Sequence, residues 1–371
     1  MSRPDVLILG GGIIGLACAR ELACTGRRVE VLERREAGAE ASLAAAGMLA
    51  PLSESPAPGP FLDACQASRD LWVSWVPALE EEAGISLDYD TSGALQVALD
   101  EEEERSLDGF ARAAEELGER IEEIEVETLR HWVPDISPDA RRALRVLGDH
   151  RIDNIQACAA LKISAARHGV VLSYGFEAER VETAGPGVRV TGKGGDTREA
   201  EVLVLAAGAW SGHLSGLPHL PVRPVRGQMA LLGGVEWPWK GSVRGPHAYA
   251  VRRGETGLLI GATVEEAGFA AHTTVGGVQS LLAFARRTFP GLEGARLEAV
   301  WAGLRPGTPD GLPILGFLPG HPVLAATGHF RNGILLAPWT ARQVAALLDA
   351  GPAADPPPGL APFHPGRLLT P

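Results

Sequence analysis

The feature that most constrains this chain is a glycine cluster near its start, in the stretch DVLILGGGIIGLACARELACTGRRVEVLE. Before the glycines, residues 5–9 form a short apolar run with the composition of a buried parallel strand. After them, residues 13–26 have helical periodicity and end at Gly26, a residue suited to a helix C-terminus. Residues 29–33 then read as a second strand. The sequence therefore predicts a strand, tight turn, helix and strand in succession.

The glycines of this unit have the spacing G-x-G-x-x-G. Gly10 permits the tight turn, Gly12 lets the backbone approach a pyrophosphate, and Gly15 allows the helix to pack closely on the strand. Glu33 follows eighteen residues after Gly15, where a carboxylate can accept hydrogen bonds from ribose hydroxyls and disfavours the 2′-phosphate of NADP. We predict a Rossmann-like dinucleotide site; the alternative is a glycine-rich turn in an ordinary α/β unit.

A second motif, AEVLVLAAGAWS (residues 200–211), separates FAD from NAD. It resembles the strand and turn by which FAD proteins of the glutathione reductase type return the chain to the cofactor. The alternative is another buried strand that ends at Gly208. A pyridine-nucleotide reductase would need a second G-x-G-x-x-G, and the sequence contains none. The motif therefore favours FAD.

Composition excludes several classes of protein. The 371 residues carry a net charge of −12, which argues against a nucleic acid partner. No apolar run reaches the roughly 18 residues of a membrane span, and the N-terminus lacks the pattern of a signal peptide. The four cysteines have no C-x-x-C spacing and no histidine partners at metal-ligand intervals. We expect a cytoplasmic protein with reduced thiols and no metal site.

The remaining pattern predicts a mixed α/β chain. Predicted helices cover residues 61–83, the acidic run 101–129, 154–169, 276–288 and 340–350, the last beginning with Thr340 as its N-cap. Predicted strands cover residues 170–174, 188–192, 200–210, 222–232, 247–253, 256–263, 297–306 and 323–328. Residues 36–60 and the proline-rich tail are predicted to be irregular.

Five blocks carry a family resemblance: ILGGGIIGLACARELACTGRRVEVLER, ASLAAAGMLAP, VLVLAAGAWS, WAGLRPGTPDGLPILG and TGHFRNGILLAP. Together they resemble the glycine oxidase branch of the D-amino acid oxidase family of FAD-dependent oxidoreductases. The resemblance implies an α/β fold (α+β overall) in which a Rossmann-like FAD domain of the glutathione reductase type is built from residues 1–84, 149–222 and 305–371. Residues 85–148 and 223–304 would form a substrate domain with a mixed, largely antiparallel sheet.

The resemblance also implies the cofactor contacts. Ala46, Gly47 and Met48 would run beside the flavin ring, and the backbone near Ala178 would meet the adenine. The loop TGHFRNG would aim backbone N–H groups at the flavin N1 and O2 atoms, with Asn332 and Gly333 forming the sharp turn. The full set of expected FAD contacts is Gly10, Gly12, Ile13, Ile14, Gly15, Glu33, Arg34, Ser42, Ala46, Gly47, Met48, Ala178, Gly208, Trp210, His329, Phe330, Arg331, Asn332, Gly333 and Ile334. After LLAP the chain departs from the family pattern at Trp339, which puts the contacts of that turn in doubt.

FAD is expected to bind noncovalently. Related enzymes attach flavin through a C-terminal cysteine or through a histidine in the AAAGM region. Here no cysteine follows Cys158, and no histidine lies between Ser42 and Met48.

The substrate site is expected around Arg305, which matches the carboxylate-binding arginine of the family. A planar guanidinium can hold a carboxylate through two parallel hydrogen bonds. Tyr249 and His247 match positions that line the same pocket, and Arg331 is a second arginine beside it. Without the resemblance, a lone tyrosine on a strand such as Tyr249 is more often a core residue, and Arg305, followed by Pro306 and Gly307, has the alternative of a surface turn residue.

The resemblance implies oxidative deamination of glycine and small primary or secondary amino acids, in the service of thiamine biosynthesis. Hydride transfer from Cα to FAD would give an imine that hydrolyses to the α-keto acid, glyoxylate from glycine, with ammonia or an amine. Molecular oxygen would accept the electrons as hydrogen peroxide. A homo-oligomer, such as a tetramer, is also implied. A D-amino acid dehydrogenase, a sarcosine-type N-methyl amino acid oxidase and a non-catalytic flavin-binding protein remain as alternatives.

Overall fold

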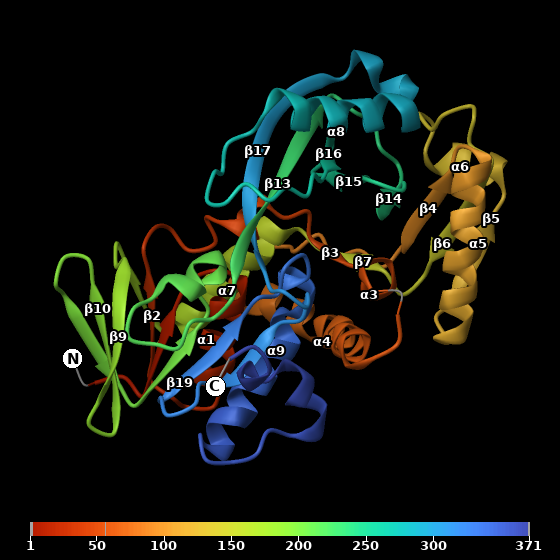
Figure 1. The fold of residues 1–371 in the computed structure, drawn as a ribbon. Coiled ribbons are helices and arrows are strands. Elements are labelled where there is room, and N and C mark those ends of the chain that lie inside the picture. Colours follow the sequence, from red (N-terminus) through yellow and green to blue (C-terminus); the bar gives the residue numbers. More distant parts are fainter. Residues whose placement is uncertain (1–2, 56, 370–371) are drawn as a thin grey trace.

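A computed structural model describes residues 3–55 and 57–369, and its centre is a largely parallel sheet with the strand order β18-β19-β12-β1-β2-β8 (Figure 1). Its strands are β1 (Val6–Leu9), β2 (Val29–Glu33), β8 (Val171–Tyr174), β12 (Val202–Leu205), β18 (Ile314–Phe317) and β19 (Val323–Thr327). Only the pairing of β18 with β19 is antiparallel in this described sheet. Strands β1 and β12 are almost wholly buried, which explains why both are uninterrupted apolar runs, whereas the edge strand β8 is partly exposed.

Helices cover one face of this sheet and a small antiparallel sheet covers the other. The helices are α1 (Ile13–Cys24), α4 (Pro60–Ala83), α7 (Asn154–Arg167) and α9 (Gly333–Ala350), and they share one core with Val6 and Ile8 of β1. The small sheet has the order β11-β10-β9, with β9 (Ala178–Ala184), β10 (Gly187–Gly192) and β11 (Thr197–Ala200). It packs on Leu7 and Leu9, the alternate residues of β1.

A second large sheet, with the order β17-β13-β16-β15-β14-β4-β6-β5, is antiparallel except where β14 pairs with β4. Its strands are β4 (Ala94–Ala98), β5 (Ile121–Ile124), β6 (Arg142–Val146), β13 (Arg223–Gly233), β14 (Ser242–Arg244), β15 (Tyr249–Arg253), β16 (Gly257–Gly261) and β17 (Arg296–Gly307). The predicted α/β fold with a mixed, largely antiparallel second sheet is confirmed.

The second sheet has one covered face and one face turned to the first unit. Helices α5 (Glu101–Glu116), α6 (Val126–Trp132) and α8 (Val275–Thr288) belong to its outer layer, and Leu129 and Leu281 share a core with its strands. On the inner face, Met229, Tyr249 and Leu259 pack against Ala46 from the first unit. The segments by which the chain passes from one unit to the other therefore lie next to this inner face, in the middle of the molecule (Figure 1).

The remaining elements are short. They are α2 (Ala41–Ala44), α3 (Pro51–Glu54), β3 (Met48–Leu49), which pairs with β7 (His150–Arg151), and the 3₁₀ helices η1 (Gly208–His213), η2 (Pro290–Gly294), η3 (Pro358–Phe363) and η4 (Pro365–Arg367). Residues 36–60, predicted to be irregular, thus contain three short elements. The acidic run 101–129 is not one helix, because β5 separates α5 from α6. No helix within residues 3–55 and 57–369 is long and apolar enough to cross a membrane.

The last helix begins earlier than predicted, and the prediction of Thr340 as its N-cap was wrong. Helix α9 starts at Gly333 with Asn332 as its N-cap, and Thr340 is fully buried inside it. Pro338 made a start after residue 338 plausible, because a proline within a helix leaves a carbonyl without its usual partner. In the structure, the side chain of Trp72 supplies the missing donor, at 3.1 Å from the oxygen of Ile334.

Candidate functional site

A cavity with about 1080 Å³ of empty space, part of it open to solvent, lies between the two units. It is bordered by the start of α1, the segment Ala41–Met48, the inner face of the second sheet and the loop before α9. Fifteen of the predicted site residues line it: Gly12, Ile13, Ile14, Ser42, Ala46, Gly47, Met48, Gly208, Tyr249, Arg305, His329, Phe330, Arg331, Gly333 and Ile334. Segments far apart in the sequence therefore meet at one site.

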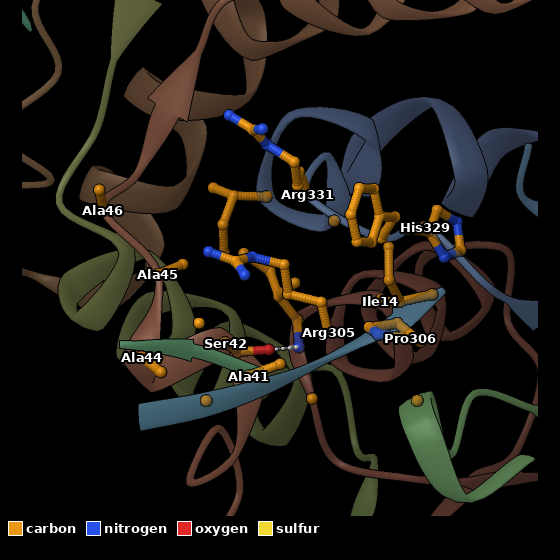
Figure 2. A pocket seen from close by; sticks show the side chains of 18 of the residues that line it. Ile14, Ala41, Ser42, Ala44, Ala45, Ala46, Arg305, Pro306, His329 and Arg331 are labelled. Carbon is orange, nitrogen blue, oxygen red and sulfur yellow. Dashed lines mark hydrogen bonds between the residues drawn. The ribbon is translucent and has the colours of Figure 1, made fainter. Parts of the chain in front are cut away.

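The glycine turn sits at the end of β1 and opens toward this cavity. Gly10 has φ +108°, and a Cβ there would lie 2.3 Å from the oxygen of Ala206. A Cβ on Gly15 would lie 1.9 Å from the oxygen of Gly10, so a larger residue would push α1 off the sheet. Gly12 caps α1 without a side chain, which leaves the helix N-terminus accessible. The N–H of Ile13 donates to Ser42 Oγ at 2.9 Å, the bond drawn in Figure 2.

Glu33 closes this turn from the end of β2. Its carboxylate accepts from the N–H of Gly11 at 2.7 Å and from the N–H of Arg35 at 2.8 Å. These bonds hold the carboxylate beside the glycine turn while its remaining lone pairs stay available. The chain that leads to Ala178 passes the same strand end, where the N–H of Phe176 donates to the oxygen of Glu33 at 3.0 Å. Glu33 and the approach to Ala178 are therefore close together, as an adenosine site requires.

Arg34 and Trp210 lie outside the cavity but touch each other. The Arg34 guanidinium stacks on the Trp210 ring with 3.7 Å to its centroid, and it also forms an ion pair with Glu40. Both residues follow strand ends of the parallel sheet, β2 and β12. The stacked pair extends the border of the site beyond the glycine turn.

The segment Ala46–Met48 is fixed by backbone contacts. Gly47 has φ +81°, and a Cβ there would lie 1.8 Å from the oxygen of Ile152. The N–H of Ile152 donates to the oxygen of Gly47 at 2.8 Å, and Met48 pairs with Arg151. This crossing strand is held in place before any ligand binds, and its residues face the cavity.

The loop from Gly328 to Asn332 makes its turn at residues other than those predicted. The left-handed backbone conformations are at Gly328 (φ +77°) and Phe330 (φ +48°), whereas Asn332 has φ −104°. The prediction that Asn332 and Gly333 form the turn was therefore wrong: Asn332 caps α9 and Gly333 begins it. The physical result is a helix N-terminus, with its free N–H groups and partial positive charge, beside the cavity.

His329 supports this loop from inside the protein. Its Nε2 lies 3.0 Å from Thr340 Oγ1, and the ring is buried. Burial lowers the pKa of His329 to about 3, so the imidazole is neutral at physiological pH.

Arg305 is the central cation of the cavity. Strand β17 pairs with β13, so that Arg305 stands beside Gly227, and a Cβ on Gly227 would lie 2.2 Å from Arg305 Nη1. Arg305 Nη1 donates to the oxygen of Thr263 at 3.0 Å, which leaves other N–H groups free. Burial lowers the pKa of this guanidinium from its usual value. A carboxylate in the cavity would satisfy both its charge and its free donors.

Tyr249 lies in the same cavity and is buried. Its hydroxyl lies 3.6 Å from the sulfur of Met229, a weak acceptor, and burial raises the pKa of the phenol. The neutral hydroxyl can therefore donate to a bound anion near Arg305. His247, two residues earlier, precedes β15 and is exposed. The structure does not bring His247 into the lining of the cavity.

Glu54 is a cavity residue that the sequence did not reveal. Arg331 Nε lies 2.9 Å from Glu54 Oε2, and Arg244 Nη2 lies 2.6 Å from Glu54 Oε1. Burial works to raise the pKa of Glu54, but Arg244 and Arg331 outweigh it and hold the pKa below its usual value. Arg331 is thus already paired with an anion, whereas Arg305 forms no ion pair with any carboxylate of residues 3–55 and 57–369. Figure 2 shows Arg305 and Arg331 reaching into the pocket from separate segments.

These features fit a flavin dinucleotide. Helix α1 presents its N-terminus where a pyrophosphate would lie, and α9 presents a second N-terminus at the cavity. Both sites favour negative charge: the first suits phosphates, and the second suits a flavin ring that becomes anionic on reduction. FAD would supply the redox chemistry, while the protein would bind and orient the reactants.

Comparison with known proteins decides the family. A family model described as DAO, FAD dependent oxidoreductase, matches residues 5–347. The chain belongs to the DAO family of FAD-dependent oxidoreductases. FAD is therefore its cofactor, and the predicted family is confirmed.

Relatives of this DAO-family chain include proteins of two lengths. It is 37% identical to the bifunctional protein ThiO/ThiG of Synechocystis over all of its own length but only 55% of that protein. The chain thus spans about half the length of the bifunctional relatives it matches. It is 35% identical to glycine oxidase of Pseudomonas aeruginosa, with 98% of this chain and 99% of the relative covered.

The fold comparison agrees with these relatives. The crystal structure of glycine oxidase from Geobacillus kaustophilus matches with a TM-score of 0.91 and 34% identity. The match covers 100% of this chain and 99% of the other. The arrangement of the two units around the cavity is therefore similar to that of an enzyme named for glycine.

Proposed function

We propose that this protein is a glycine oxidase: an FAD-dependent enzyme that deaminates glycine and other small primary or secondary amino acids. The observation that carries the proposal is the half-buried Arg305 guanidinium over Gly227, beside Tyr249, in the cavity that joins the glycine turn to α9. Among the described residues no carboxylate forms an ion pair with Arg305, so this half-buried cation favours an anionic ligand. The relatives named glycine oxidase support a small α-amino acid as that ligand.

The residues would divide the work as follows. Arg305 and Tyr249 bind the substrate carboxylate and so orient Cα toward the flavin. The buried Met229 and the half-buried Met48 limit the space for a side chain. The N-terminus of α9 stabilises the negative charge that the ring acquires on reduction. FAD, when bound, would supply the two-electron oxidation of the amino acid to an imine, which water would hydrolyse to glyoxylate and ammonia, with oxygen as the final electron acceptor.

The site arrangement also supports the division of the chain into an FAD-binding and a substrate-binding part. Residues 1–84, 149–222 and 305–371 supply the parallel sheet and the glycine turn, and residues 85–148 and 223–304 supply most of the second sheet. We infer that FAD is held noncovalently, because the cavity lining within the described residues includes no cysteine. Acid precipitation should release all of the yellow colour into the supernatant.

We infer the pathway of the enzyme from its relatives and its cellular compartment from its thiols. The likeness to a ThiO/ThiG protein supports a role in thiamine biosynthesis, and the four free cysteines suit a reducing cytoplasm. We further infer a homo-oligomer, such as a tetramer. Light scattering coupled to size exclusion would give its mass.

Anaerobic titration tests the proposed function directly. Glycine should bleach the flavin absorbance, and readmitted oxygen should restore it with release of peroxide. Sarcosine that bleaches far faster than glycine would favour a sarcosine-type oxidase, and reoxidation by a quinone but not by oxygen would favour a dehydrogenase. A flavin that none of a panel of amino acids reduces would overturn the proposal.

A further inference from the structure

A second cavity, lined mainly by apolar side chains, lies next to the cofactor cavity. It has about 970 Å³ of empty space, part of it open to solvent, between α2, the start of α7 and the inner face of the second sheet. Its apolar lining includes Leu43, Ile155, Leu231, Leu259 and Trp301. Charges occur at Glu40 and Arg253. The proposed binding of a charged amino acid makes no use of this space.

The two cavities share two lining residues, which form a common wall. Ala44 and Gly303 line both of them. A Cβ on Gly303 would lie 2.5 Å from the Cβ of Ala44, so only glycine permits this close approach of β17 to α2. Next to the wall, Trp301 Nε1 donates to the oxygen of Ala44 at 3.3 Å. The partition is therefore made of the smallest side chains, and neither of them carries a charge.

The opposite part of the cofactor cavity has a different character. There Glu54 is paired with Arg331, whose side chain is 35% exposed, so this part is polar and reaches solvent. In Figure 2, Arg331 and Ala44 lie well apart, with Arg305 between them. A zwitterionic amino acid is attracted to the charged part, whereas an uncharged diatomic molecule gains nothing from charges and enters apolar space readily.

We propose that the second cavity admits dioxygen to the flavin through the Ala44–Gly303 wall. This inference rests on the proposed oxidase function, in which two electrons from the reduced flavin and two protons convert oxygen to hydrogen peroxide. Substrate and oxygen then reach the ring from different sides, so bound amino acid or product does not block the oxygen path.

Xenon is a direct probe of the site, because it binds in apolar pockets. Crystals of the holoenzyme under xenon pressure should show anomalous density in the second cavity. Leu43→Trp, at a side chain that is 46% exposed on the rim, should lose this density. Val275→Trp is the matched control, because Val275 is 88% exposed and does not line the second cavity.

Rapid mixing of the reduced enzyme with oxygen measures how each substitution changes the rate of flavin reoxidation. After anaerobic reduction, the second-order rate constant for reoxidation by oxygen should fall several-fold in Leu43→Trp. The same loss should occur in Ala271→Trp, on another part of the rim, which guards against a local effect on α2. Val275→Trp should reoxidise like the parent, and all three variants should keep the parent's rate of bleaching by glycine.

Two results would overturn the oxygen path: a second cavity without xenon in the parent crystals, or parent-like reoxidation in both rim variants. Failure of the proposed function has a different signature. In that case glycine would not bleach the parent enzyme, while the xenon result would still stand on its own.

Discussion

At the scale of single residues, Arg305 and Gly227 act together to position one positive charge in the cavity. Arg305 lies on β17 and Gly227 on the neighbouring β13, and the guanidinium occupies the space that a side chain at 227 would take. Because the half-buried guanidinium fills that space, the missing side chain decides where its charge is held. The carboxylate site therefore depends on a residue that has no functional group.

Both residues can be tested by kinetics. Arg305→Ala removes the partner of a buried anion, which costs on the order of 3 to 5 kcal/mol and so lowers kcat/KM for glycine by roughly 10² to 10³ or more. Arg305→Lys should recover only part of this loss, since a point charge cannot form two parallel bonds. Gly227→Ala should also lower kcat/KM by displacing the guanidinium. FAD content should stay normal, and parent-like turnover of glycine by Arg305→Ala would make Arg331 the next candidate.

The buried His329 leads to a separate prediction about the pH dependence of the free energy of unfolding. Its pKa is about 3 in the folded protein and about 6.5 when unfolded, so unfolding binds a proton below pH 6.5. The stability that His329 contributes is thus present above pH 6.5 and is lost as the pH falls toward 3, by up to about 1.4 kcal/mol per unit. Asp149, whose pKa burial raises to about 6, acts in the opposite sense.

The measurement is urea unfolding of the apoprotein at a series of pH values, for the parent and for His329→Gln. The difference between the two curves isolates the histidine from Asp149 and all other groups. The parent should lose stability faster than the variant below pH 6.5. Curves that stay parallel down to pH 4 would show that His329 is not buried as a neutral ring.

At the scale of elements, α9 is continuous through Pro338 because side chains of α4 form hydrogen bonds with the backbone groups that lack helical partners near this proline. Trp72 Nε1 donates to the oxygens of Ile334 and Leu335, at 3.1 and 3.0 Å. Ser68 Oγ donates to Leu335 at 2.6 Å, and it accepts from the N–H of Trp339 at 3.2 Å. The buried Trp339, which departs from the family pattern, is thereby built into the helix and packs on Phe363. The helix N-terminus at the cavity depends on these contacts.

Removing the hydrogen bonds between the α4 side chains and the α9 backbone should destabilise the protein. Trp72→Phe and Ser68→Ala each leave a buried backbone group without a partner, which costs about 1 to 3 kcal/mol of unfolding free energy. Ser74→Ala, at an exposed position of the same helix, is the control and should change stability little. Urea denaturation of the apoprotein measures all three. If Ser68→Ala is as stable as Ser74→Ala, the contacts between α4 and α9 do not sustain the helix.

At the scale of the whole molecule, the cofactor site joins segments from both ends of the chain. The glycine turn lies near the N-terminus, the crossing segment Ala46–Met48 follows, and α9 comes from the C-terminal part. A ligand that binds only when these segments are assembled stabilises the folded state in proportion to its affinity. FAD should therefore raise the melting temperature of the apoprotein.

Glu33→Gln tests this linkage. Glutamine keeps one acceptor but loses the charge, and a charge-assisted bond contributes about 1.5 to 3 kcal/mol. The Kd for FAD should rise roughly tenfold to a hundredfold. At a fixed FAD concentration, the gain in melting temperature should shrink accordingly. Enzyme saturated with FAD should keep most of its turnover. An unchanged Kd, measured by fluorescence titration, would contradict the role assigned to Glu33.

The features that could be predicted from the sequence are those that depend on contiguous residues. Gly10 and Glu33 belong to one β1–α1–β2 unit, where each backbone conformation is set by neighbours close in the chain. The dinucleotide-binding motif can therefore be recognised from the sequence alone. The blocks that resemble the family also include segments near both ends of the chain. The same local rules placed most strands and helices correctly.

Features that depend on residues far apart in the chain became visible in the folded structure alone. Glu54 meets Arg244 across 190 positions and Arg331 across 277, and no local pattern records such a pair. The start of α9 depended on Trp72, which local rules about Pro338 could not include. The physical reason is that packing decides which remote groups share a buried space. A buried charge or carbonyl must then find its partner there.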